Sequence, residues 1–407
     1  AGAYLQAWEI KPAVVNGTDY LNMYQGAYEG KPISVYGAGD AGNPMKFIPV
    51  SEVEFADYTV TGKANHTPDH KFTLWYTEPA TTARLYDGGQ GYSNWMEWSL
   101  PIGNGQLGAS LFGGVKRDEI QINEKTLWSG TASSNGSEYG QYENFGSVFV
   151  ENIGEDFSLE TNEGATDYYR SLDLADALGK VSFKSAKSQT EYTREYFASN
   201  PDKVIVARYT AANGPATLNL RFTLQSGNIL GRTTNYSDGS GYFSGNTFSG
   251  ATQTVKYALR FKVVNTGGTL TTDENGITVT GATEVKVVIS GATDFDPASP
   301  TYVSGTSQLN ANLRNTVNEA AAKSYAELKS AHLDDYHALW NRMSLELSGT
   351  QNTVPTNTLI DTYNSGADAK ALMLENLYFA YGRYLEIASS RGVALPSNLQ
   401  GIWSNMD

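Results

Sequence analysis

WMEWSLPIGNGQLGASLFGGVKRDEIQINEKTLWSG, residues 95–130, places five glycines between short apolar runs. Glycines at this density mark tight turns and places where two backbones approach closely. The run 107–112 has the length of a strand, and the Gly113-Gly114 pair can turn the chain into a second one. We therefore predict hairpin strands over this stretch, with Asn104 in a turn.

The GNGQLG portion of this stretch also resembles a glycine-rich phosphate-binding loop. A dinucleotide fingerprint requires a strand before the loop, a helix after it and an acidic residue further along. The segment 111–122 that follows has the pattern of hairpin strands and not of an amphipathic helix. Nucleotide binding is therefore not expected here.

Alternating apolar and polar residues predict further strands outward from this stretch. Residues 217–224 alternate strictly, and 255–263 repeat the pattern. Such alternation is typical of strands with one packed and one solvated face. We predict a mainly β chain with a large antiparallel β-sandwich over residues 72–300, interrupted by a long polar loop over 129–164.

Beyond residue 300 the apolar residues change to helical spacing. Residues 301–350 are predicted as a helical linker, and Ala369–Ser390 as a long helix that is apolar nearly all round. A helix without a polar face is buried on all sides. We therefore predict that residues 351–407 are the start of a larger helical domain. Without the rest of that domain, exposed apolar surface is expected at Leu374, Leu377, Tyr381 and Leu385.

The N-terminal residues 1–54 contain short apolar runs separated by turn signals, and we predict an accessory β-element there. Residues 20–50 loosely resemble part of a β-trefoil lectin repeat. One repeat cannot bury a trefoil core, so this stretch indicates at most a remnant. The polar residues 55–71 are predicted as a linker.

The composition limits the classes of partner. A net charge of −14 disfavours nucleic acid and anionic membrane surfaces, because both repel an acidic chain. The absence of cysteine excludes disulfides and thiolate metal sites. The 26 tyrosines suit carbohydrate binding, but they are also ordinary packing residues in β-proteins. We expect a secreted or periplasmic protein whose signal peptide is not in the chain.

The chain is similar to the N-terminal portion of glycoside hydrolase family 95 over about residues 72–407. The similarity is carried by seven motifs in order: LWYTEPA (74–80), PIGNGQLGASLFGG (101–114), IQINEKTLWSG (120–130), DYYRSLDLADALGKVSF (167–183), YTREYFASNPDKVIVARYTA (192–211), HLDDYHALWNRMSLEL (332–347) and GRYLEIASSRGVALPSNLQGIW (382–403).

This resemblance implies an exo-acting glycosidase that hydrolyses terminal α-L-fucosyl linkages with inversion, needs no cofactor and has an (α/α)6 barrel after its sandwich. The implied partners are a fucosylated oligosaccharide or polysaccharide and the remainder of the barrel. Two alternatives stay open. One is an α-L-galactosidase of the same family, whose sugar differs by a hydroxyl at C6. The other is a non-catalytic carbohydrate-binding or scaffolding module.

The family's general acid and its Asn-x-Asn pair lie in the barrel, and the pair follows shortly after the motif found here at Leu395–Trp403. The chain ends soon after that motif, so the resemblance assigns no catalytic residue, and residues 1–407 alone are expected to be inactive. Glu375 and Glu386 are interpreted as helix residues. Seven residues remain as substrate-binding candidates, with a domain-interface role as the alternative: Asn123, Glu124, Thr126, Trp128, Asn398, Gln400 and Trp403.

A metal site is not expected from the histidine spacing. His66 and His70 are four apart, but Pro68 between them breaks helical facing. His332 and His337 are five apart and so lie on different faces of a helix. All four histidines are interpreted as surface or helix-interface residues.

Overall fold

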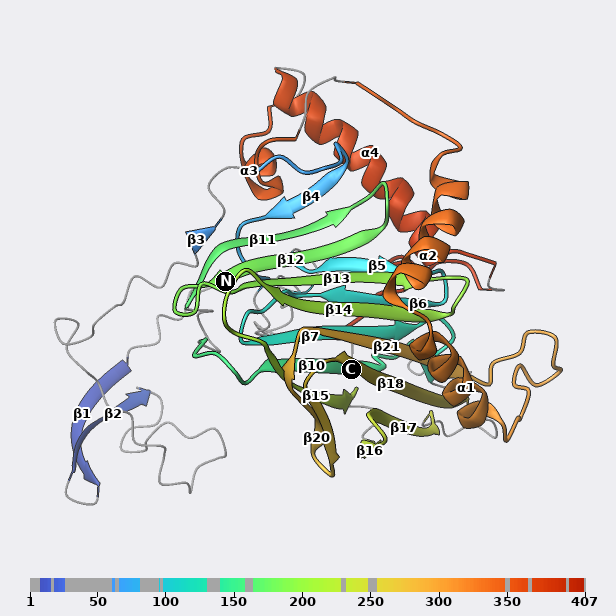
Figure 1. The fold of residues 1–407 in the computed structure, drawn as a ribbon, viewed down its shortest axis with the longest axis horizontal. Helices are drawn as coiled ribbons and strands as arrows, with labels where there is room; N and C mark the ends of the chain where they lie inside the picture. Colours follow the sequence, from blue (N-terminus) through green and yellow to red (C-terminus); the bar gives the residue numbers. More distant parts are fainter. Residues whose placement is uncertain are drawn as a thin grey trace. The chain divides into compact units, whose positions relative to one another are not determined.

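The chain divides into two compact units, Ala1–Tyr58 and Thr59–Asp407. In the first unit, β1 (Trp8–Val15) and β2 (Thr18–Gln25) form an antiparallel hairpin. The rest of the lectin-like stretch lies outside the described residues. The computed structural model describes residues 8–15, 18–25, 61–62, 66–80, 95, 98–129, 140–157, 164–227, 232–247, 255–347, 352–364, 368–392 and 395–405 (Figure 1).

The second unit is built around two large sheets of mainly antiparallel strands, which confirms the predicted β fold (Figure 1). The seven-stranded sheet has the order β19 (Thr269–Asp273), β20 (Gly276–Ala282), β15 (Leu218–Ser226), β10 (Gly146–Asn152), β7 (Arg117–Glu124), β6 (Leu107–Leu111) and β5 (Leu100–Gly103). The ten-stranded sheet has the order β16 (Asn235–Ser237), β17 (Ser240–Asn246), β18 (Lys256–Thr266), β21 (Glu284–Thr293), β14 (Val204–Ala212), β13 (Glu191–Ser199), β12 (Leu178–Ser185), β11 (Ala165–Asp173) and β3 (Thr61–Gly62). Strand β4 (Thr73–Tyr76) also pairs with β11, and β3 pairs with β11 in parallel.

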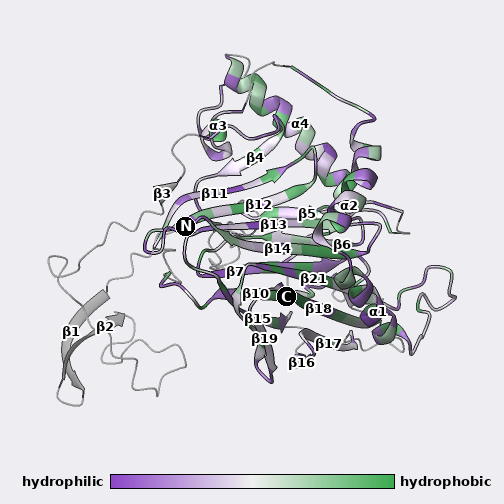
Figure 2. Ribbon diagram, in the orientation of Figure 1, coloured by the Kyte–Doolittle hydropathy of each residue, from purple (hydrophilic) through white to green (hydrophobic). Residues whose placement is uncertain are grey.

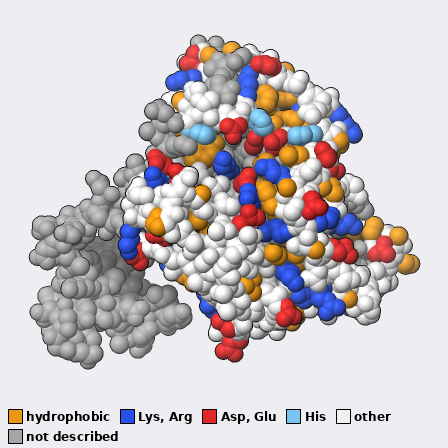
Figure 3. Space-filling view, viewed as in Figure 1, with side chains coloured by type: hydrophobic (Ala, Val, Ile, Leu, Met, Phe, Trp, Pro, Cys, Tyr) orange, Lys and Arg blue, Asp and Glu red, His pale blue; other side chains and the backbone are white. Residues whose placement is uncertain are grey.

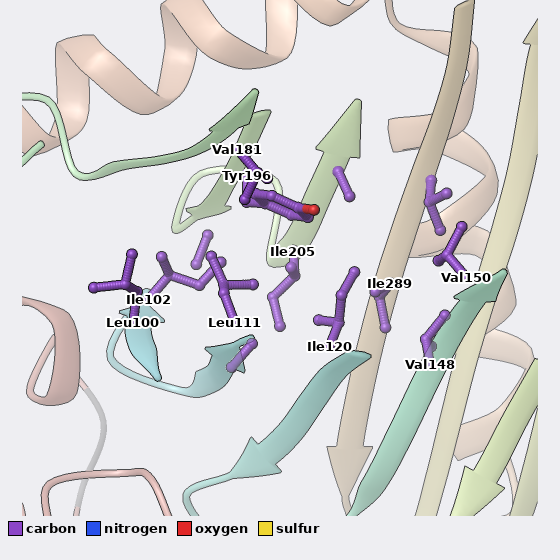
Figure 4. Close-up of a cluster of buried hydrophobic side chains, with 14 of the residues drawn as sticks. Leu100, Ile102, Leu111, Ile120, Val148, Val150, Val181, Tyr196, Ile205 and Ile289 are labelled. Atoms are coloured by element: carbon purple, nitrogen blue, oxygen red, sulfur yellow. The ribbon is translucent and has the colours of Figure 1, made fainter. Parts of the chain in front are cut away.

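The main core combines apolar side chains of the two sheets. Phe222 of β15 and Phe261 of β18 are fully buried, as the alternation predicted, and the alternation of hydrophobic and hydrophilic residues is visible along the strands in Figure 2. Ile120 of the seven-stranded sheet lies in one cluster with Ile205 and Ile289 of the ten-stranded sheet (Figure 4). Each such burial stabilises the fold by about 1.5–3 kcal/mol, so the sandwich provides a rigid base for the loops at its edges.

Two helices, α1 (Leu309–Ala322) and α2 (Tyr325–Trp340), pack on the ten-stranded sheet. Val317 of α1 is fully buried in a second cluster with residues of that sheet. A capping box begins α2: the Ser324 hydroxyl accepts from the backbone N–H of Glu327, whose carboxylate accepts from the Ser324 N–H. The helical spacing beyond residue 300 thus corresponds to two separate helices.

Helix α4 (Ala369–Ser389) follows the short helix α3 (Thr356–Asp361) and packs beside β5 (Figure 1). Its N-cap is Asp368, and the hydroxyl of Tyr384 donates to the carbonyl of Pro101 at 2.7 Å. Burial of α4 on all sides is predicted for a complete helical domain and stays a prediction; in this chain Tyr378 is 80% exposed. The prediction of an exposed Leu377 is wrong, because that side chain is 1% exposed and packs in the main core.

Two stretches differ from the predicted loop and linker. The predicted loop 129–164 contains β10, which pairs with both β7 and β15 in the seven-stranded sheet. Within the predicted linker 55–71, β3 pairs with β11, and His66 packs its ring on Tyr169. Among the described helices, none combines the length and the apolar character needed to cross a membrane.

Candidate functional site

The glycines between β5 and β6 allow the end of α4 to approach the sandwich closely. Gly105, with a φ of 87°, donates its N–H to the carbonyl of Ala388 at 2.7 Å. A Cβ at Gly103 would lie 2.6 Å from that same carbonyl oxygen, and one at Gly108 would lie 2.8 Å from Ile402. These glycines therefore serve backbone packing. The predicted turn role of Asn104 is confirmed, because its side chain accepts from two N–H groups of the turn.

Asn123 holds the backbone of Ser404. The Asn123 side chain donates to the Ser404 carbonyl at 2.9 Å and accepts from the Ser404 N–H at 3.1 Å. Gln121, on the same face of β7, also donates to that carbonyl. Asn123 is fully buried, so its polar groups are used within the protein.

Glu124 and Thr126, next to Asn123 in the sequence, are joined by hydrogen bonds. A Glu124 carboxylate oxygen accepts from the Thr126 N–H at 2.9 Å and from the Thr126 hydroxyl at 2.7 Å. Burial raises the pKa of Glu124 from its ordinary value of 4.5 to about 7, and the hydrogen bonds from Thr126 act in the opposite direction. The neighbouring Lys125 ammonium donates to the Ser389 carbonyl at 2.7 Å.

Trp128 packs rather than standing free as a platform. Its ring lies 5.2 Å from that of Tyr142, and its indole N–H donates to the Lys125 carbonyl at 3.0 Å. The Tyr142 hydroxyl donates to the Ile402 carbonyl at 2.8 Å. Four side chains bind backbone carbonyls of residues 389–404, and we call these four residues the junction: Gln121, Asn123, Lys125 and Tyr142.

A cavity of about 500 Å³, here called the pocket, opens between β5, α4 and the turn 397–401. Asn398, Gln400 and Trp403 of the predicted set line it, whereas Asn123, Glu124, Thr126 and Trp128 are not among its lining residues. The Trp403 ring is 5% exposed, and its indole N–H donates to the Ile102 carbonyl at 2.9 Å. The buried Oδ1 of Asn398 has no hydrogen-bond partner among the described residues.

Most of the lining residues were not predicted as site residues, among them Trp95, Tyr381 and Glu386. Tyr381, Leu385 and Ser389 line the pocket at a spacing of four along α4, so a stripe of that period was the available signal. Glu386 is the only carboxylate among the described residues that line this cavity.

A second hollow of about 580 Å³ lies between α3, α4 and β4 and is lined mainly by apolar side chains. The polar side chains are concentrated in the pocket and not in this second hollow.

Two family models match the chain. "Glycosyl hydrolase family 65, N-terminal domain" matches residues 74–139 and 132–298, and "Glycosyl hydrolase family 95 catalytic domain" matches residues 324–407. The first match covers the strands of the sandwich, and the second covers α2 to α4 and the turn at the pocket.

Similar proteins include "Alpha-L-fucosidase 2" of Arabidopsis thaliana, 28% identical over 76% of this chain and 42% of that protein. "Probable alpha-fucosidase A" of Aspergillus niger is 30% identical over 77% of this chain and 44% of that protein. The chain therefore spans less than half the length of these relatives. The solved structure "Putative kojibiose phosphorylase from human microbiome" aligns with a TM-score of 0.45 and 12% identity, over 71% of this chain and 39% of that chain. On the match to the family 95 catalytic domain and these relatives, the chain belongs to glycoside hydrolase family 95.

Proposed function

We propose that this chain is the N-terminal part of an exo-acting glycosidase that releases terminal α-L-fucose with inversion. The observation that carries the proposal is the pocket, which lies within the segment matched by the family 95 catalytic domain and is walled on its other side by the sandwich. The fucosidase names of the similar proteins support the same substrate class.

The lining of the pocket suits one sugar ring. Its volume of about 500 Å³ falls within the usual range for small-molecule sites. Trp95 and Tyr381 offer aromatic surface for the apolar face of a pyranose, and Asn398 and Gln400 offer amides for its hydroxyls.

Inversion requires two carboxyl groups about 6.5–9.5 Å apart, one as the acid and one as the base that activates water. Among the described residues lining the pocket, Glu386 alone carries a carboxylate. We propose that the acid–base pair is not complete within residues 1–407. Because general acid–base catalysis contributes about 10²–10⁴-fold, we expect the isolated chain to hydrolyse fucosides no faster than buffer does.

The test is an assay of the full-length product that carries this chain, with nitrophenyl α-L-fucoside and α-L-galactoside as substrates. We expect faster release from the fucoside, with β-L-fucose as the first anomer seen by proton NMR. A higher kcat/KM on the galactoside would favour the α-L-galactosidase alternative. Release of the α-anomer first would overturn inversion.

A non-catalytic sugar-binding module is the second candidate, because the described pocket is lined without a pair of carboxylates. In that case, residues 1–407 would bind fucosylated glycans, and the full-length product would hydrolyse neither nitrophenyl glycoside. Hydrolysis of either substrate by the full-length product would reject this candidate.

A further inference from the structure

Three segments distant in the sequence bring histidines and aspartates together on the sandwich. His70 precedes β4, Asp173 ends β11, Asp176 lies in the turn before β12, and His337 lies in the last turn of α2. The sequence spacing gave no reason to expect a metal at His66–His70 or His332–His337. The structure pairs His70 and His337 with the two aspartates. Acidic side chains lie among histidine side chains on the face shown in Figure 3.

The distances place three potential ligand atoms around one point. His70 Nδ1 lies 2.6 Å from Asp173 Oδ2 and 3.8 Å from Asp176 Oδ2. All three ligand atoms lie within 4.8 Å of one another. Ligand atoms bound to Zn²⁺ at about 2.0–2.2 Å in a tetrahedral site are separated by roughly 3.4 Å. The distances of 2.6 and 3.8 Å fall on either side of this separation, so small side-chain rotations would give a common centre.

The arrangement of charges in the cluster favours a cation. The carboxylates of Asp173 and Asp176 both lie within 4 Å of the single His70 Nδ1. A divalent cation at their centre would compensate both carboxylate charges at once.

We propose that His70 Nδ1 and one oxygen each of Asp173 and Asp176 bind a divalent transition-metal ion, with Zn²⁺ as the representative case. A mixed imidazole and carboxylate set suits Zn²⁺ and its neighbours, whereas Ca²⁺ and Mg²⁺ prefer all-oxygen sets with six or more ligands. His337 Nε2 lies 2.8 Å from the other oxygen of Asp176. Such an outer hydrogen bond orients a ligating carboxylate.

The bound ion would join the segment before β4 to the turn after β11, and the outer bond from His337 would connect that turn to α2. His332, one turn earlier on α2, lies with Nε2 2.9 Å from the Asp176 carbonyl oxygen and stacks on Phe197. The helix is therefore already held over the Asp173–Asp176 turn. None of the four cluster residues lines the pocket, so this site is independent of the proposed hydrolysis.

The test is isothermal titration of the untagged 407-residue chain with ZnCl₂ after dialysis against EDTA and removal of the chelator. We expect one site in the micromolar range, little competition from Ca²⁺ or Mg²⁺, and a rise in the thermal midpoint with Zn²⁺. His70→Ala and Asp173→Asn should each weaken binding at least tenfold. His337→Ala should weaken it by about 10–100-fold, as is usual for outer partners of ligands.

The matched control is Asp156→Asn, which removes an exposed carboxylate paired with Lys187 outside the cluster and should leave the affinity unchanged. Circular dichroism of each variant verifies that it folds. If His70→Ala does not fold, the shift of the imidazole NMR signals of the unmodified chain on adding Zn²⁺ provides the second readout. Absence of saturable binding in the micromolar range, or binding unaffected by His70→Ala and Asp173→Asn, would overturn the proposal.

Discussion

The junction and the pocket both involve the C-terminal segment 389–404, and each contains an asparagine whose polar groups are used differently. At the junction, Asn123 is fully buried and both of its polar groups bind the Ser404 peptide. In the pocket, Asn398 is half-buried and its Oδ1 has no partner among the described residues. The two asparagines therefore differ in their use: the polar groups of Asn123 maintain the fold, whereas the Oδ1 of Asn398 is not used in it by any of the described residues.

The largest expected effect is on stability at the junction. Asn123→Ala removes the partner of the buried Ser404 N–H, which costs about 1–3 kcal/mol, and one hydrogen bond to the Ser404 carbonyl, which costs about 0.5–1.5 kcal/mol, or about 1.5–4.5 kcal/mol together. Guanidinium unfolding followed by tryptophan fluorescence measures this loss. The matched variant Asn398→Ala should cost under about 1 kcal/mol, because its Oδ1 has no hydrogen-bond partner among the described residues to lose. Equal losses in the two variants would remove the distinction between the two regions.

The second effect is a pH dependence of stability that arises beside the junction. The folded-state pKa of Glu124 is raised to about 7, so the folded protein binds more protons than the unfolded chain between pH 4.5 and 7. The free energy of unfolding should therefore fall as the pH rises through this window, by up to about 3 kcal/mol at 1.4 kcal/mol per pKa unit.

Glu124→Gln removes this titrating group, so the variant should show a flatter stability profile from pH 4.5 to 7 and greater stability than the parent at pH 8. Thermal midpoints at a series of pH values give the comparison. A parent and variant with parallel profiles would show that Glu124 is ionised in the folded state throughout this range.

Gly382→Ala should raise the stability of α4 and lower the affinity of the pocket for sugar. Gly382 lies within α4, and a Cβ there would meet nothing within 4 Å. Alanine should therefore stabilise the helix by about 0.8–1.0 kcal/mol. The same methyl group would protrude into the pocket, so the affinity for L-fucose, measured by NMR titration, should fall. A stabilised variant with unchanged affinity would place the sugar elsewhere.

The smallest expected effect on stability is that of Gln400→Ala. Gln400 is exposed at the rim of the pocket, so the free energy of unfolding should change by less than about 0.5 kcal/mol. Loss of one hydrogen bond to sugar, worth about 0.5–1.5 kcal/mol, should weaken L-fucose binding by about 2–10-fold. A change in stability without a change in affinity would assign Gln400 to the fold.

The alternation of apolar and polar residues within a single strand predicted the strands that bury only one face. The alternation in β15 and β18 identified both strands because one face of each is apolar. Strand β10 was missed because its polar residues are buried too: the Ser147 hydroxyl donates to Glu119 at 2.7 Å. That cross-strand pairing satisfies a polar group in a way that composition does not reveal.

The site was predictable only in part. The motif around Trp403 contains the three predicted site residues that line the pocket, Asn398, Gln400 and Trp403. The direction of each side chain in the motif at 123–128 depends on a partner segment more than 260 residues away, and no spacing within the motif encodes that partner. For the same reason, Glu386 was interpreted as an ordinary helix residue, since only the position of α4 against β5 places it at a cavity.

The contacts of the junction also constrain the order of folding. The bond from Asn123 to Ser404 spans 281 residues, and that from Trp403 to Ile102 spans 301. Closing such long loops costs entropy before any contact compensates it, and a chain emerging from the ribosome acquires its N-terminal parts first. We expect the sandwich to form early and the segment 389–404 to dock late. Pulse-labelling hydrogen exchange during refolding would show the Ser404 amide protected after those of β14 and β21, and earlier protection of Ser404 would reverse this order.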